Sequence, residues 1–313
     1  MTAATTAAPT PRKGLGAALR SEETRWAFIF LLPWVIGFVV FTAIPMILSF
    51  IYSITNLGFS GKFDWVGAAN YERLFKDPNV GLAFGNTIFY AVLHVPLSMA
   101  IALALAMMLL RVGRAAGFFR TVFYLPTITP AVAIGALWLY LLNGQVGIIN
   151  RGLALFGIDG PDWTTDPAWI KPGIILMSLW SLGSTVVIYF AALRNVPNEL
   201  YEAAKIDGAN AWDSFRNITI PFISGALFFT LIVNTIASLQ IFTEVYTMFF
   251  GSQQGSAGER SGLFYVIYLF RQAFEQFKFG YASALAWALF IVILIITVIQ
   301  LRLSKRWVYY EGE

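Results

Sequence analysis

The sequence predicts an all-α integral membrane protein, built as a bundle of six transmembrane helices. Of its 313 residues, 58% are hydrophobic and only 12% are charged, and the mean hydropathy is +0.68. A soluble domain carries about 25% charged residues, so this chain lacks the polar groups to cover a surface that faces water. Six apolar stretches reach the roughly 20 residues that a helix needs to cross a bilayer. They run over residues 26–52, 87–110, 121–142, 170–193, 223–250 and 281–301.

The composition also argues against several kinds of chemistry. The chain contains no cysteine, which removes disulfides, thiolate metal sites and cysteine nucleophiles. A single histidine, His94, is too few for a histidine metal site, and we expect it to be an ordinary residue of the bundle. The net charge of +4 is too small to indicate a nucleic-acid partner.

The positions of Lys and Arg predict the orientation, because cytoplasmic loops are enriched in these residues. Thirteen of the 21 lie in the terminal segments and in the short loops at 111–120 and 194–222, and eight are spread over three longer loops. We therefore expect both termini to be cytoplasmic. Residues 1–25 are predicted to be a mostly disordered tail, 26–301 the transmembrane domain, and 302–313 a C-terminal tail.

Two prolines predict an interruption of the third apolar stretch. Pro126 and Pro130 each remove a backbone hydrogen bond, and Thr127 and Thr129 lie between them. Broken backbone at membrane depth is tolerated where it faces protein or a water-filled cavity. We therefore expect this break to face inward, either in protein packing or along a cavity.

The loop over residues 194–222 predicts a helix-turn-helix on the cytoplasmic face. Pro197 suits the first turn of a helix, and Gly208 suits its C-terminal end. Asn210 is expected to cap a second short helix, with Asp213 as the acidic partner three residues later. Without further information, an ordinary solvated amphipathic loop explains these residues equally well.

The same loop contains a spaced motif made of Glu202, Ala203, Ala204, Gly208, Ile218, Ile220 and Pro221. This motif resembles the EAA loop of importer-type ABC transporter permeases, in which Glu-Ala-Ala is followed by three residues, Gly, nine residues, Ile, one residue and Leu-Pro. The spacing is the same here, with Ile220 in place of Leu. The resemblance implies an importer-type permease bundle with a cytoplasmic coupling helix that docks on a separate ATP-hydrolysing subunit.

Further segments are similar to the carbohydrate-uptake branch, the maltose and glycerol-phosphate type of inner-membrane permease. They include Asn70-Tyr71, Asp77-Pro78, Asn86-Thr87, Glu199-Leu200-Tyr201 and Gly280–Ala284. This resemblance implies a bacterial or archaeal plasma membrane protein that works with a second permease subunit, a dimer of cytoplasmic ATP-binding subunits and an extracellular or periplasmic solute-binding protein. The chain lacks a G-x-x-x-x-G-K-[ST] phosphate loop. We therefore expect this chain to bind no cofactor, with ATP and Mg²⁺ held by the partner.

The resemblance also suggests where a sugar would pass through the bundle. By approximate correspondence the pathway residues are Thr127, Trp180, Gly183, Ser184, Ser238, Gln240 and Ile241. Small and hydroxyl residues also serve ordinary packing between membrane helices, so each has a structural explanation beside the functional one. Glu244, a charge within the fifth apolar stretch, is expected to face the bundle interior or the outer water, and a structural role is favoured over proton coupling.

Three other functions are alternatives to a sugar-importer permease. The first is an ABC permease for a polyamine, phosphate or peptide. The segments from Asn70 to Thr87 argue against it, because they resemble the outer segment of carbohydrate-type permeases. The second is an ion-coupled secondary transporter, a class that usually has more spans and internal repeats and would leave the EAA loop unexplained. The third is a membrane enzyme, for which no plausible catalytic set is present.

Overall fold

The computed structural model describes residues 22–61, 63–250 and 258–309, and the secondary structure of these residues is helical apart from one isolated bridge between Thr55 and Trp65. The predicted tail of residues 1–25 lies mostly outside the described residues. The helices are α2 Glu22–Phe38, α3 Ile44–Ser53, α4 Ala69–Lys76, α5 Pro78–Arg111, α6 Ala116–Tyr124, α7 Ala131–Leu141, α8 Ile148–Ala154, α9 Ile170–Leu179, α10 Gly183–Arg194, α11 Asn198–Ile206, α12 Ala211–Ser214, α13 Ile220–Phe222, α14 Ser224–Leu239, α15 Thr243–Phe249, α16 Gly258–Ser261, α17 Tyr265–Phe270 and α18 Phe279–Ser304.

Four helical segments are long and apolar enough to cross a membrane. They are Arg25–Ser53, Pro78–Arg111, Ser224–Phe249 and Phe279–Ser304. Two further apolar stretches are each bent pairs, with angles of 98° between Gly113–Ile128 and Ala131–Leu141 and 48° between Ile170–Leu179 and Gly183–Arg194. The break predicted from Pro126 and Pro130 is therefore present, whereas the bend at residues 180–182 was not predicted.

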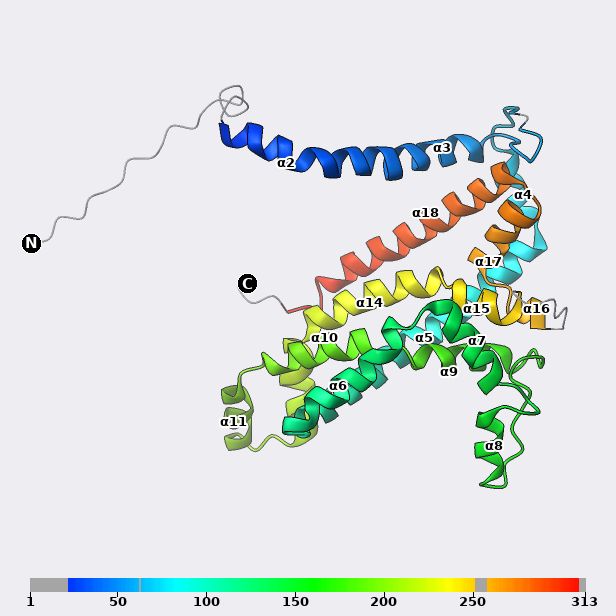
Figure 1. Ribbon diagram of the computed structural model, residues 1–313. Helices are drawn as coiled ribbons and strands as arrows, with labels where there is room; N and C mark the ends of the chain where they lie inside the picture. Colours follow the sequence, from blue (N-terminus) through cyan, green and yellow to red (C-terminus); the bar gives the residue numbers. More distant parts are fainter. Residues whose placement is uncertain (1–21, 62, 251–257, 310–313) are drawn as a thin grey trace, which may run out of the picture.

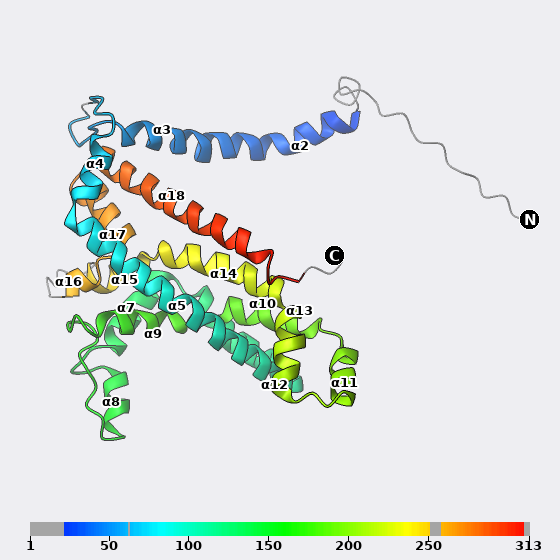
Figure 2. The ribbon, with the colours of Figure 1, turned by 180° about the vertical axis from the view of Figure 1, so that it is seen from behind.

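The bundle has two ends, which α4 and α11 mark in Figures 1 and 2, and each end has its own hydrophobic core. One core lies at the α4 end, where Ile174, Val245 and Phe264 are almost completely buried. The other lies at the α11 end, where Val186, Tyr189 and Ile223 are buried. α5 spans the distance between them and packs on α10 and α14.

The first membrane segment stands apart from the rest of the bundle. α2 and α3 extend away from it, and α3 meets α18 toward the α4 end (Figure 1). None of the residues from 25 to 52 is buried, and Phe41 is 80% exposed. Such an apolar surface must be covered by lipid or by another protein.

Residues of the predicted outer segment hold the α4 end together. The Asn70 amide donates to the carbonyls of Ser53 and Thr55 at 2.9 and 2.8 Å. Gly280 brings α18 close to the same backbone segment. A Cβ at Gly280 would lie 2.1 Å from the Thr55 carbonyl oxygen, and the Gly280 N–H donates to the Leu57 carbonyl at 2.9 Å. The small residue is therefore required by this close approach.

Two polar residues of the α4 end, Asn86 and Asp77, tie α5 to the chain around α16 and α17. The side-chain amide of Asn86 donates from Nδ2 to the carbonyls of Arg260 and Leu263 at 2.8 and 3.0 Å, and its Oδ1 accepts from Lys171 Nζ at 3.0 Å. Asp77 caps α5 by accepting from the Asn79 amide. The apolar segment at residues 262–270 packs on the bundle, where Phe264 is completely buried.

The carboxylate of Asp77 also accepts the hydroxyls of Tyr268 and Tyr281 at 2.5 and 2.9 Å. Partial burial raises the pKa of this carboxyl, but the two tyrosine hydrogen bonds and the Asn79 amide lower the pKa by more, so its net pKa is below the usual value. The charged form of Asp77 is therefore the one that stabilises the fold.

Candidate functional site

The loop at residues 194–222 forms the predicted helix-turn-helix at the α11 end. Pro197 lies immediately before α11 as its N-cap residue, one position earlier than a first-turn proline. Gly208 follows the helix with φ +80°, and the next amide, of Ala209, donates back to the Ala204 carbonyl at 2.9 Å. This left-handed ending suits glycine because a Cβ is disfavoured there.

The predicted cap of the second helix is present. The Asn210 side chain accepts from the amides of Trp212 and Asp213 at 2.8 and 3.0 Å, and Asp213 accepts from the Asn210 amide at 3.3 Å. α12 does not end as an isolated short helix. It continues through the π-helical turn Phe215–Thr219 and α13 toward α14, and the Tyr201 hydroxyl ties α11 to this turn through Thr219 at 2.9 Å.

The helix-turn-helix presents a surface that the rest of the chain does not cover. Glu202, Ala203 and Gly208 are exposed, whereas Ala204 is partly covered, and Ile218 and Pro221 are half-buried beneath them. Two large apolar side chains of the helix-turn-helix are also exposed, Ile206 at 87% and Trp212 at 64%, and Ile206 lies one helical turn after Glu202. Exposed apolar side chains beside a charged one are typical of a protein-docking surface.

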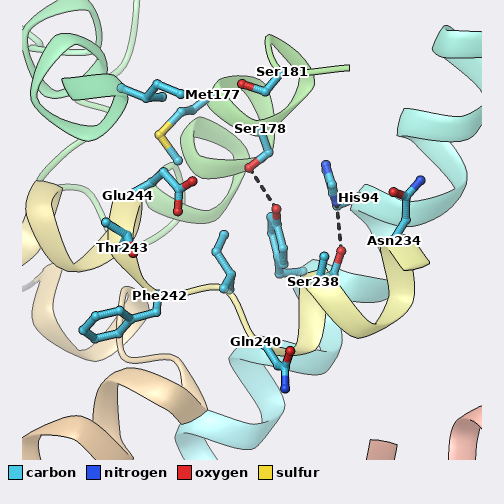
Figure 3. A pocket seen from close by; sticks show the side chains of 14 residues that line it. His94, Met177, Ser178, Ser181, Asn234, Ser238, Gln240, Phe242, Thr243 and Glu244 are labelled. Carbon is cyan, nitrogen blue, oxygen red and sulfur yellow. Dashed lines mark hydrogen bonds between the residues drawn. The ribbon is translucent and has the colours of Figure 1, made fainter. Parts of the chain in front are cut away.

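A second feature is a cavity of about 350 Å³ inside the bundle (Figure 3). It lies where two helices are interrupted, at the bend between α9 and α10 and at the break between α14 and α15. Polar side chains supply much of its wall. The lining residues are Tyr90, His94, Ile134, Met177, Ser178, Ser181, Asn234, Ala237, Ser238, Gln240, Ile241, Phe242, Thr243 and Glu244.

The polar wall is held by hydrogen bonds between helices. His94 Nδ1 and Ser238 Oγ are 3.1 Å apart, and the Tyr90 hydroxyl donates to Ser178 Oγ at 2.8 Å, as Figure 3 shows. The rings of Tyr90 and His94 stack with centroids 4.9 Å apart. His94 Nε2 is buried and has no partner among the described residues, so it is the ring atom with hydrogen-bonding capacity to spare.

Glu244 lies in the first turn of α15 and faces this cavity from the side of Met177 and Thr243 (Figure 3). α7 and α15 meet closely here, since a Cβ on Gly135 would lie 2.7 Å from the Glu244 carbonyl oxygen. The carboxylate therefore faces the bundle interior, one of the two positions expected for it.

The structure gathers part of the predicted pathway set around the cavity. Ser238, Gln240 and Ile241 line it, whereas Thr127, Trp180, Gly183 and Ser184 are outside its lining. Sequence reasoning missed Tyr90, Ser178, Ser181 and Asn234 as neighbours of those three. Tyr90 and Asn234 carried no local signal because their contribution depends on which helices meet.

The four remaining residues lie near the bends. Thr127 donates to the Tyr124 carbonyl at 2.6 Å within the broken third stretch. Trp180 packs edge-on against Trp138, with centroids 6.2 Å apart. Gly183 begins α10 against the backbone of Phe123. Within the described residues, no group of three His, Cys, Asp or Glu side chains is placed to hold a metal ion.

Comparisons with known proteins agree with this architecture. The chain is 36% identical over 290 residues to a probable ABC transporter permease protein, YesP, of Bacillus subtilis, covering 91% of this chain and 92% of that protein. It is 34% identical over 286 residues to the lactose transport system permease protein LacF of Rhizobium radiobacter, covering 89% and 94%. It is also 30% identical to the arabinooligosaccharides transport system permease protein AraP of Bacillus subtilis, covering 91% and 90%.

Among solved structures, the fold matches a chain of a bacterial alginate ABC transporter, solved in complex with an alginate pentasaccharide-bound periplasmic protein. The TM-score is 0.81 at 23% identity, and the match covers 94% of this chain and 98% of that one. The model of one protein family matches residues 95–309. The chain therefore belongs to the family of binding-protein-dependent transport system inner membrane components, as a multi-pass transport subunit rather than an enzyme.

Proposed function

We propose that this protein is a permease subunit of an ATP-driven ABC importer for a sugar or oligosaccharide. Its exposed helix-turn-helix carries the proposal, because that surface provides a place for an outside energy source to act on the bundle. The printed functions of LacF and AraP, lactose and arabinooligosaccharide transport, support a carbohydrate as the solute. A second permease subunit, a pair of ATP-binding subunits and a solute-binding protein outside the cell complete the proposed assembly.

In this proposal each bent pair crosses the membrane once, which gives six spans with both termini in the cytoplasm. The 98° and 48° bends support this count because both lie within apolar stretches of full spanning length. The α11 end then faces the cytoplasm and the α4 end faces outward. The uncovered face of α2 and α3 is available to lipid or to the second permease.

α11 acts as the coupling helix by docking on an ATP-binding subunit. Ile206 and Trp212 supply apolar contact to that subunit, and Glu202 supplies a charge beside them. The hydrogen bond between Tyr201 and Thr219 links α11 to the turn that leads into α14. A displacement of α11 is thereby transmitted to the helix that forms one wall of the cavity.

The cavity is the proposed solute site. Its volume of about 350 Å³ is at the lower end of the roughly 300–1,000 Å³ found for small-molecule sites. Hydroxyl and amide groups from Ser181, Asn234 and Ser238 suit the hydroxyl rim of a sugar, and Phe242 and Tyr90 supply apolar area. The second permease would complete the pathway.

The test uses the complex reconstituted in vesicles, with solute uptake and ATP hydrolysis measured together. Replacing Glu202 by Gln or Gly208 by Val is expected to reduce uptake at least tenfold while the protein still inserts and binds lipid. Glu199→Gln is the matched control, since Glu199 is an exposed glutamate of the same helix outside the Glu-Ala-Ala triplet. Wild-type coupling in both variants would contradict the proposed role of α11, and ATP hydrolysis by the purified chain alone would contradict the need for a partner.

One observation favours a second candidate, an importer for a positively charged solute. Glu244 places a carboxylate in the cavity wall, where charge is costly to leave without a partner. A neutral sugar predicts that Glu244→Gln preserves the affinity for the solute within a few-fold. A cationic solute predicts a loss of a hundredfold or more, because the ion pair would be removed from a site with little water.

A further inference from the structure

Another cavity, of about 380 Å³, lies at the α11 end of the bundle and is distinct from the proposed solute site. It lies between the last turn of α5, the start of α6 and the end of α10. Three arginines line it, Arg114, Arg120 and Arg194. We call it the arginine pocket. None of its lining residues is acidic.

Two of the three guanidinium groups are held in place by the pocket itself. Arg120 and Arg194 both lie over the ring of Phe190, at 5.0 and 5.8 Å from its centroid. Phe190 is buried, so it forms a fixed platform. Arg120 Nε also donates to the Ala116 carbonyl at 3.3 Å, which leaves the terminal nitrogens of its fork for another acceptor.

The charge of this cluster is not neutralised within the described chain. The described residues, 22–61, 63–250 and 258–309, contain one ion pair within 4 Å. It joins Arg271 and Glu275 at the far end of the bundle. Arginines gathered around a cavity repel one another unless an anion lies between them. The planar guanidinium group of arginine suits the oxygens of a phosphate group particularly well.

We propose that the arginine pocket binds a phosphate group, and that its source is the headgroup of an anionic phospholipid. The lipid is favoured over free phosphate because exposed apolar side chains belong to the lining or adjoin it in the chain. Leu110 lines the pocket and is 41% exposed, and Val112 and Phe118, each next to a lining glycine, are 40% and 69% exposed. A headgroup in the pocket would place its glycerol and acyl carbons against them.

A lipid bound in the arginine pocket would affect the loop that holds α11. α10 leads directly into the loop that holds α11, and Arg194 is the last residue of α10. A bound phosphate would join that residue to the start of α6 and so fix the end of the bundle from which the helix-turn-helix projects. The lipid would thus order the base of α11. This inference uses the position of the proposed coupling helix but not the identity of the solute.

The test measures lipid binding to the purified full-length chain by native mass spectrometry, with phosphatidylglycerol as the probe. Removal of one arginine near a membrane surface weakens binding of anionic lipid about fivefold, so Arg120→Gln combined with Arg194→Gln should raise the apparent Kd of the tightest lipid roughly 25-fold. Arg302→Gln combined with Lys305→Gln is the matched control. It removes two positive charges at the end of α18, outside the pocket, and should leave that Kd within about twofold.

A second variant covers a failure of the double variant to fold. Arg114 is exposed on a short turn, and Arg114→Gln should weaken lipid binding about fivefold without disturbing the packing. Equal losses in the pocket and control variants would show only general attraction of anionic lipid and would overturn the proposal, as would no loss in either. Equal thermal stabilisation of the wild-type chain by inorganic phosphate and by phosphatidylglycerol would overturn the lipid as source. Unchanged lipid binding with lost assembly of the ATP-binding subunits would assign the pocket to a protein partner instead.

Discussion

Replacing Gly183 by alanine tests which of two roles this residue has, solute contact or helix packing. The sequence resemblance places Gly183 on the solute pathway, whereas the structure places it where α10 meets the end of α6. A Cβ at this position would lie 2.2 Å from the Phe123 carbonyl oxygen and 2.7 Å from the Tyr124 Cα. Both are backbone atoms, which no rotamer change can move aside.

The size of the effect follows from these distances. Ordinary contact with a Cβ begins at 3.4 Å, so the two backbones would have to separate by about 1.2 Å. Overpacking of this kind costs about 1–3 kcal/mol. For a chain of this size, such a loss lowers the unfolding midpoint on the order of 5 °C. Gly225→Ala is the control, because nothing lies within 4 Å of a Cβ at Gly225 in the first turn of α14.

The assay is thermal unfolding of the purified chain in detergent, followed by intrinsic tryptophan fluorescence. The chain has ten tryptophans and no cysteine, so thiol-reactive dyes would give no signal. Gly183→Ala should unfold several degrees below Gly225→Ala. Equal midpoints for the two variants, together with a loss of solute transport in Gly183→Ala alone, would refute a packing role for Gly183.

Three further predictions concern polar ties and a cap. Asp77→Asn should lower the free energy of unfolding by about 1–3 kcal/mol at neutral pH. Because folding lowers the pKa of Asp77, the wild type should lose this stability as the pH falls below about 4. Thermal unfolding at pH 3 should therefore show a smaller difference between the two proteins. Asn86→Leu should cost at least about 2 kcal/mol, since it leaves two carbonyls and the Lys171 ammonium without their partner; an unchanged unfolding midpoint would contradict this. Asn210→Ala should remove about 1 kcal/mol of capping energy and speed hydrogen exchange of the α12 amides roughly fivefold, with the α18 amides unchanged as the internal reference.

Local chemistry in the sequence predicted several features that the structure contains. Four of the six predicted apolar stretches form helical segments of spanning length and the other two form bent pairs, and the double proline at 126 and 130 lies at the break in one of these pairs. The ends of α11 and α12 follow from Gly208 and Asn210, because a left-handed residue and a side-chain cap act within a few residues of their own position. These features depend on neighbours along the chain, and the sequence contains all of those neighbours.

The sequence by itself therefore determined the membrane class, the apolar stretches and the helix-turn-helix. Only the tertiary structure decided where the cavity lies and what surrounds it. The bend at 180–182 and the break at 240–242 contain no proline, so packing between helices fixes them. The same is true of Tyr90 beside Ser178, which are 88 residues apart, and of the arginines over Phe190. A helix period indicates which residues share a face, but the partner of that face is set by contacts distant in sequence.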